Sequence, residues 1–252
     1  MAATETDPTA STRPPAVFVT THWSAVLSAA RNDTTRARAS LEHLCRTYYY
    51  PIYFFVRRQG HSTYDAQDLT QEFFARLLEK HWLADADQSR GRFRSFMLLI
   101  LRRFLTVEWR KANALKRAGN LNPLPLPLDT AEVRYGREPA DNFSPDQAFE
   151  KQWALTLLDT VLQNLGAEYD RAGHARLFEV LKPSLTGSRE TQPYAALALA
   201  LKMSEGAVRV AVHRLRERYR ELLQAEVAQT VASPAEVQDE LRHLFRVLTR
   251  TR

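Results

Sequence analysis

Apolar residues recur every three or four positions along most of the chain, which is the spacing of amphipathic helices. One such stretch covers residues 35–58, and Gly60 is placed to end it. Pro51 lies inside this stretch and has no backbone N–H, so we expect it to break or kink the helix. We find no strong alternating pattern of the kind that predicts strands. The fold class predicted from the pattern is therefore all-α.

The same spacing predicts further helices in the first half of the chain. One begins near Thr21, one follows Ser62, and one runs over residues 93–117. We expect residues 21–118 to form one compact helical unit. Residues 1–20, rich in Ala, Thr, Pro and Ser, precede it as a disordered tail.

Residues 119–143 have a different composition. The Leu-Pro-Leu-Pro-Leu sequence at 124–128 is incompatible with a helix and predicts an extended segment. Acidic residues outnumber basic ones around it. We therefore predict a flexible acidic linker between two small helical domains.

The second predicted domain covers residues 144–232 and begins at Ser144, a helix-capping residue followed by proline. A short Ala-rich helix is expected at 194–201. After a sharp turn, a long helix capped by Ser204 is expected to run to about residue 228. Residues 233–252 show one apolar face and predict a C-terminal amphipathic helix.

Composition excludes several classes of protein. Hydrophobic residues make up 44%, enough to form cores, yet no apolar run is long enough to span a bilayer, so we predict no membrane contact. The single Cys45 excludes an internal disulfide and a multi-cysteine zinc site. The motifs of phosphate loops, nucleophile elbows and helical zinc sites are missing from the sequence. We predict a cytoplasmic, nucleoid-associated protein that is not an enzyme and needs no metal or cofactor.

Charge is distributed unevenly. The net charge of the whole chain is +6, whereas residues 90–117 hold nine basic side chains against one acid, Glu108. Aromatic residues are interleaved with them, and we expect Phe96 and Phe104 to be core. Basic groups neutralise phosphates and exposed aromatics stack on unpaired bases, so this stretch predicts a nucleic-acid surface.

An acidic stripe precedes the basic stretch. Asp65, Asp68 and Glu72 recur at spacings that place them on one face of the predicted helix. Favourable interaction with the helix dipole explains the first two but not the third. A basic protein partner explains all three.

The helix–turn–helix pattern at 194–228 is the third feature. Small residues let two helices cross closely, and in DNA-binding proteins of this kind the start of the second helix enters the major groove. An ordinary helical hairpin remains an alternative. Val210, Ala211 and Val212 are apolar, and for them we favour packing over base contact.

In this order the three features resemble a bacterial RNA polymerase sigma factor of the extracytoplasmic-function (ECF) type, in the sigma-seventy superfamily. Asp-Ala-Gln-Asp-Leu-Thr-Gln-Glu-Phe-Phe at 65–74 is similar to the family's Asp-Ala-Glu-Asp-Leu-x-Gln-Glu-x-Phe motif. Phe-Arg-Ser-Phe at 93–96 is similar to its Phe-Arg-x-Trp sequence. Met-Ser-Glu-Gly-Ala-Val-Arg at 203–209 is similar to the helix-turn-helix of region 4. The resemblance implies that residues 21–118 are region 2 and residues 144–232 are region 4.

The resemblance also implies partners and residue roles. The partners would be core RNA polymerase, through its beta-prime clamp coiled coil and beta flap, and promoter DNA, with an anti-sigma factor or a Ser/Thr kinase as regulator. The clamp-binding residues would be Asp65, Asp68, Gln71 and Glu72. The region 2 residues at DNA would be Trp82, Arg92, Phe93, Arg94, Arg110, Lys111, Asn113, Lys116 and Arg117. The region 4 residues at DNA would be Ser204, Glu205, Ala207, Val208, Arg209, His213, Arg214 and Arg216.

Two other functions remain open at this stage. A two-domain transcriptional repressor would bind duplex DNA through residues 194–220 without polymerase, as a dimer on paired half-sites. A sigma-like interaction protein would instead sequester a regulator. Thr63 and Thr70 flank the acidic stripe, so a kinase could change polymerase affinity there by adding charge.

Overall fold

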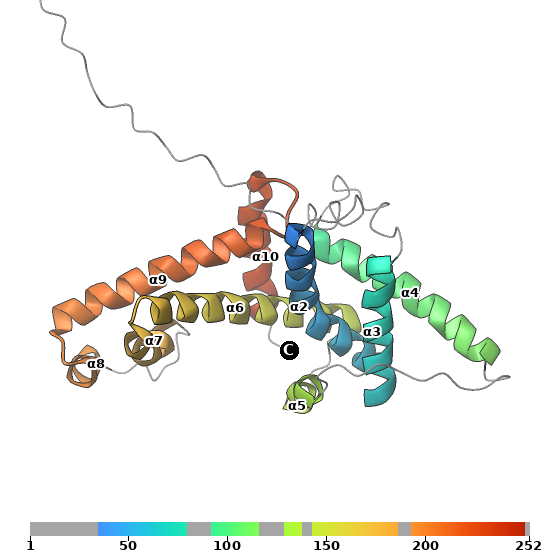
Figure 1. Cartoon of the computed structure of the whole chain (residues 1–252), viewed down its shortest axis with the longest axis horizontal. Helices are drawn as coiled ribbons and strands as arrows, with labels where there is room; N and C mark the ends of the chain where they lie inside the picture. The colour runs from blue at the N-terminus through green and yellow to red at the C-terminus, as the bar shows by residue number, and fades with distance from the viewer. Residues whose placement is uncertain (1–34, 80–91, 116–128, 138–142, 186–192, 250–252) are drawn as a thin grey trace, which may run out of the picture.

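The structure is a computed structural model in which residues 35–79, 92–115, 129–137, 143–185 and 193–249 are described. Within these ranges all regular elements are helical, which confirms the predicted fold class there (Figure 1). The tail at 1–20 and the helix predicted near Thr21 lie outside the described residues. The α-helices are α2 (Thr35–Arg58), α3 (Thr63–Glu79), α4 (Phe93–Leu115), α5 (Asp129–Arg137), α6 (Pro145–Arg171), α7 (Ala175–Leu181), α8 (Tyr194–Leu201), α9 (Glu205–Ala228) and α10 (Val237–Thr249).

Of the two effects predicted for Pro51, a break or a kink, the break is wrong, because α2 continues through this residue. Proline in a helix removes one backbone hydrogen bond and crowds the preceding turn. Packing compensates for this here, since Tyr48, Ile52 and Phe55 on α2 are fully or almost fully buried. Tyr48 and Phe55 pack against Phe149 of α6, and α2 makes its main contacts with α3 and α6.

Helix α6 connects the two halves of the described structure. Its start has the predicted capping box, in which Ser144 Oγ accepts from the Gln147 N–H at 3.3 Å and the Ser144 N–H donates to Gln147 Oε1 at 3.1 Å. Its first half packs on α2 through Phe149 and Trp153, both completely buried. Its second half packs on α7 and α9 (Figure 1). The hydrophobic core of α2–α4 therefore continues past residue 144, where we predicted a second domain to begin.

Part of the predicted flexible linker is a helix. Residues 129–137 form α5, which packs on α2. Glu132 of α5 accepts hydrogen bonds from Tyr53, from Arg57 at 3.0 Å and from Thr63 at 3.1 Å. The ring of Tyr135 lies 5.0 Å from that of Phe54. The acidic character of the segment was visible in the sequence, but the basic and hydroxyl groups that it meets come from α2 and α3. The Leu-Pro repeat at 124–128 lies outside the described residues.

The predicted helix–turn–helix segment has the expected bounds. Helix α8 ends at Leu201, and Lys202 adopts the left-handed conformation with φ 54° and ψ 42°. The Met203 N–H donates to the Ala198 carbonyl at 3.0 Å, which is typical of a tight helix end. Ser204 then caps α9 by accepting from the Ala207 N–H at 3.2 Å. A second, smaller core lies beneath, formed by buried residues of α6, α7, α8 and α9.

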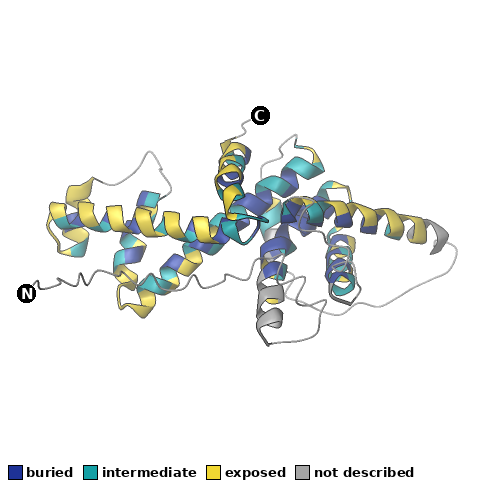
Figure 2. Ribbon diagram, turned by 90° about the horizontal axis from the view of Figure 1, so that it is seen from above, coloured by how far each residue is buried: buried dark blue, intermediate teal, exposed yellow. Residues whose placement is uncertain are grey.

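The C-terminal helix α10 is amphipathic, as the sequence predicts, and packs against α6 and α9. Leu241, Leu244 and Val247 are buried in the same core as α2–α4. Figure 2 colours the ribbon by burial and shows the buried residues gathered where the helices meet. A short 3-10 turn, Pro234–Glu236, precedes it. No described helix is long and apolar enough to cross a membrane.

Candidate functional site

The acidic stripe lies on α3, and most of it faces solvent. Ser62 caps the helix: its Oγ accepts from the Asp65 N–H at 3.1 Å and donates to the Asp65 carboxylate at 2.7 Å. Asp68 and Gln71 are half-buried, whereas Asp65 and Glu72 are exposed. Burial, and then the nearby charge of Asp65, raise the pKa of Asp68 above its usual value. The two carboxylates are therefore close enough to repel each other. A cationic partner bound to this face would relieve that repulsion.

Glu72 already has a cationic neighbour. Its carboxylate accepts from Arg76 Nε at 2.6 Å, and Arg76 Nη1 donates to Glu108 of α4 at 2.5 Å. This network joins α3 to α4. It follows that Asp65 and Asp68, and not Glu72, are the acidic groups of this face best placed for a partner.

The basic stretch forms an exposed face on the middle and end of α4. Arg102, Arg103, Arg110 and Lys111 are exposed there, and the Trp109 side chain is 66% exposed. Phe104 is buried and Phe96 is half-buried against the core, as predicted. On this cationic surface, Trp109 is the large aromatic group within the described part of α4 that is available to stack on a base.

Two predicted DNA-binding side chains are not on this surface. Phe93 is completely buried among aromatic rings and lies 5.5 Å from the ring of Tyr48. Arg94 is 4% exposed and makes ion pairs with Glu150 and Glu240. Neither side chain can contact DNA in this arrangement. The sequence pattern could not show this, because the ring of Phe93 meets Tyr48 of α2 and the carboxylates that pair with Arg94 come from α6 and α10.

Arg92 remains partly accessible, although it pairs with Glu240 at 2.8 Å. Asn113 belongs to the last turn of α4. The predicted DNA contacts of Trp82, Lys116 and Arg117 lie outside the described residues.

At the start of α9, most of the predicted DNA-contacting residues are exposed. They are Ser204, Glu205, Arg209, His213, Arg214 and Arg216, while Ala207 is half-buried. Val208 is the exception: it is completely buried in the core between α8 and α9, so it cannot contact a base. Arg216 is partly committed, since it donates to the Ser184 carbonyl at 2.9 Å.

The three apolar residues that follow behave differently from one another. Val212 is buried, as we expected, but the Val210 side chain is 50% exposed. Residues 210 and 214 are one helical turn apart and both are exposed, so the helical spacing was the signal that could have identified Val210 as a surface residue. Leu199 and Met203 add further exposed apolar groups to this end of the domain.

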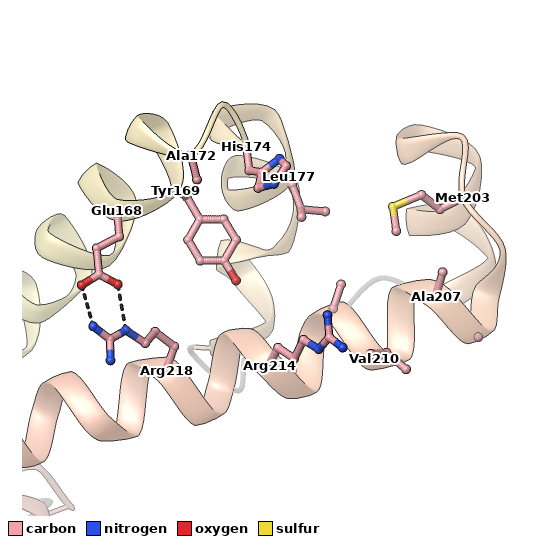
Figure 3. A pocket seen from close by; sticks show the side chains of 12 residues that line it. Glu168, Tyr169, Ala172, His174, Leu177, Met203, Ala207, Val210, Arg214 and Arg218 are labelled. Atoms are coloured by element: carbon pink, nitrogen blue, oxygen red, sulfur yellow. Dashed lines mark hydrogen bonds and ion pairs between the residues drawn. The ribbon is translucent and has the colours of Figure 1, made fainter. Parts of the chain in front are cut away.

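A groove of about 650 Å³ separates the start of α9 from the end of α6 and from α7 (Figure 3). Tyr169, Leu177, Met203 and Val210 are among the side chains that line it. At one end, two nitrogens of Arg218 donate to the two oxygens of Glu168, each at 2.8 Å. These hydrogen bonds lower the pKa of Glu168.

The described residues contain no group of three His, Cys, Asp or Glu side chains placed to hold a metal ion. Burial raises the pKa of the Cys45 thiol to about 11, so the nucleophilic thiolate is disfavoured at neutral pH. The exposed charged surfaces of α3, α4 and α9 are better suited to binding macromolecules.

A family comparison covers the helices that present the acidic and basic surfaces. Residues 44–114 match the model of the Sigma-70 region 2 family. These residues form a sigma-70 region 2 domain. The domain begins within α2, includes all of α3 and ends within the last turn of α4.

This domain implies a sigma factor role in transcription initiation and binding to core RNA polymerase. Sigma factors are non-enzymatic, in agreement with the prediction from the sequence. Comparison with curated proteins and with solved structures found no match.

Proposed function

We propose that the protein is a sigma factor of the ECF type that directs core RNA polymerase to promoters and opens the DNA there. The observation that supports this best is the region 2 domain, whose α3 exposes carboxylates while the adjacent α4 exposes arginines and Trp109. One domain thus offers separate surfaces to a basic protein and to nucleic acid.

In this proposal α3 binds the clamp coiled coil of the beta-prime subunit through Asp65 and Asp68. Helix α4 binds melted promoter DNA. Its exposed arginines neutralise phosphates, and Trp109 stacks on an unpaired base. The affinity of this surface for DNA depends strongly on salt, since each phosphate contact releases counterions.

The helices α8 and α9 act as region 4 in this proposal and bind the upstream promoter element. Exposed polar and basic groups at the start of α9 support this role, with Arg209 and Arg214 as the phosphate- or base-contacting cations. The apolar groove beside α9 is the candidate surface for the beta flap.

Run-off transcription tests the proposal. Purified full-length protein is added to core RNA polymerase with a linear template that holds the region upstream of its own operon. We expect a transcript of defined length that requires both proteins. If no upstream sequence of the operon yields such a product, the proposed function is wrong.

A duplex-binding repressor predicts a different result. It would bind the same upstream DNA tightly without polymerase and would form a symmetric dimer on paired half-sites. Measuring DNA binding with and without core polymerase separates the two functions.

A further inference from the structure

The first turn of α4 is held by carboxylates from outside the region 2 domain. Arg94 donates from Nε and Nη2 to the two oxygens of Glu240, at 2.7 and 3.2 Å, and from Nη1 to Glu150 at 2.9 Å. Arg92 Nε lies 2.8 Å from the same Glu240 carboxylate. Glu240, on α10, is completely buried. One buried carboxylate therefore binds two guanidinium groups that the sequence assigned to DNA.

The same face of α6 reaches a third arginine. Asp146 and Glu150 are one helical turn apart, and Asp146 pairs with Arg102 of α4. Arg92, just before α4, and Arg94 and Arg102 in its first half are thus paired with acids from α6 and α10. In the second half of α4, Arg110 is exposed to solvent.

The backbone strengthens this contact. The Phe93 N–H donates to the Thr230 carbonyl at 3.2 Å, and Thr230 is buried. We call residues 229–249 the C-terminal segment. Together with its buried apolar side chains, the segment covers the start of α4 through ionic, hydrogen-bonded and apolar contacts.

The pairing has the chemistry of a phosphate site. A guanidinium group binds the two oxygens of a carboxylate in the same forked geometry with which it binds a phosphate. Glu240 therefore occupies the donors that a nucleic-acid backbone would use. Buried ion pairs seldom stabilise a fold more than apolar residues of similar size, and their best-attested role is to specify or switch a structure.

We propose that the C-terminal segment is an autoinhibitory element, which keeps Arg92 and Arg94 from nucleic-acid phosphates until α10 moves away. The proposal rests on the proposed function, because it names a regulation of its DNA-binding surface. Displacement of α10 by a polyanion or by core polymerase exposes both guanidinium groups. The free protein then binds nucleic acid weakly, and the released protein binds it strongly.

Single-stranded DNA with a fluorescent label is the probe for the first test, and full-length protein is used. Glu240→Gln removes the negative charge and keeps the size of the side chain. We expect it to bind the DNA about tenfold more tightly than the unchanged protein. The salt dependence should become steeper by about 1.4 in log–log slope, since each phosphate contact on a single strand adds roughly 0.7.

Asp239→Asn is the matched control. It makes the same charge change one residue away on α10, at an exposed carboxylate that pairs only locally with Arg242. Its affinity for DNA should stay within about twofold of the unchanged protein. Equal affinities for all three proteins, or weaker binding by Glu240→Gln, would overturn the autoinhibitory role.

Hydrogen exchange on the unchanged protein gives a second measurement that does not depend on how a variant folds. Adding single-stranded DNA should accelerate exchange of the α10 amides. Unchanged or slower exchange in α10 contradicts the proposal. The autoinhibitory role can fail while the proposed function holds. Run-off transcription by the unchanged protein tests the function alone and does not depend on the movement of α10.

Discussion

Arg94 and Glu240 are 146 positions apart in the chain and form a buried ion pair with an Nε–Oε1 distance of 2.7 Å. The guanidinium also lies 5.3 Å from the ring of Trp153. The ion pair joins the first turn of α4, in the region 2 domain, to α10. The contact with Trp153 joins the same turn to α6.

Loss of the Arg94 guanidinium should lower the free energy of unfolding. Arg94→Met leaves the carboxylates of Glu240 and Glu150 with one cation fewer in a buried environment, and breaking a buried pair costs about 3–5 kcal/mol. We expect the free energy of unfolding to decrease by an amount near the lower end of this range, because Arg92 still pairs with Glu240. Urea unfolding measures it. Arg103→Met, at an exposed position of the same helix, should change the unfolding free energy by less than about 0.5 kcal/mol. Equal effects of the two substitutions would contradict the buried pair.

Charge reversal on α3 should weaken binding to core polymerase. Asp68→Lys places a cation where the basic clamp is expected to dock, and we expect the dissociation constant to rise at least about tenfold. Binding of labelled protein to core polymerase measures this, with helicity checked by circular dichroism. Asp159→Lys, an exposed reversal on α6, is the control and should leave binding unchanged. Unaltered binding by Asp68→Lys would exclude α3 as the clamp surface.

The docking of α5 should depend on pH. Partial burial opposes ionisation of Glu132, but hydrogen bonds from Tyr53, Arg57 and Thr63 outweigh it and lower the pKa of Glu132 below 4.5. A lowered folded-state pKa stabilises the fold above the unfolded-state value, and this stabilisation is lost as the pH falls through the folded-state value.

Glu132→Gln should therefore be less stable than the unchanged protein at pH 7, and the difference should shrink below about pH 4.5. Urea unfolding at pH 7 and pH 3.5 measures this. Glu42→Gln alters an exposed carboxylate on α2 and should show no such pH dependence. A constant difference at both pH values would argue against ionised Glu132 as the group that holds α5.

The protein should be more stable with glycine than with lysine at position 202. Its φ of 54° lies in the left-handed region, which costs residues with a Cβ atom about 1 kcal/mol. We expect Lys202→Gly to raise the unfolding free energy by about 0.5–1 kcal/mol. Lys182 has right-handed helical angles, so Lys182→Gly should lower it by a similar amount. Thermal unfolding measures the two changes in stability, which should have opposite signs. A loss of stability in both variants would contradict the left-handed conformation at Lys202.

Arg110 should contribute one phosphate contact. It is exposed on the second half of α4, past the arginines that pair with acids of α6 and α10. Arg110→Gln should reduce the slope of log affinity against log salt by roughly 0.7 for single-stranded DNA. Arg46→Gln on α2, which pairs with Glu42, is the control and should leave the slope unchanged. Fluorescence anisotropy across a salt series gives both slopes.

The structure also bears on the two threonines beside the acidic stripe. Thr70 is completely buried and donates to the Ala66 carbonyl at 2.7 Å, so a kinase cannot reach it in the folded helix. Thr63 is half-buried and donates to Glu132. Modification of either residue remains a prediction of the sequence alone.

Local structure followed closely from the sequence. The bounds of α2 and α8 and the caps at Ser62, Ser144 and Ser204 agree with the apolar spacing and with nearby polar residues. Helix periodicity and capping depend on residues within a few positions of each other, so the chain shows them directly. The resemblance of residues 65–74 and 93–96 to region 2 likewise needed only contiguous motifs, and the family comparison confirms that domain.

By itself the sequence thus determined the all-helical class of the described residues, most helix boundaries and the region 2 domain. Only the tertiary structure decided that Arg94 and Val208 are buried, that α5 docks on α2, and that α6 and α10 complete the core of α2–α4. The physical reason is the same in each case. A charged or apolar residue on a helix is compatible with either solvent or a partner, and the partners come from segments tens of residues away or more, which local spacing does not specify.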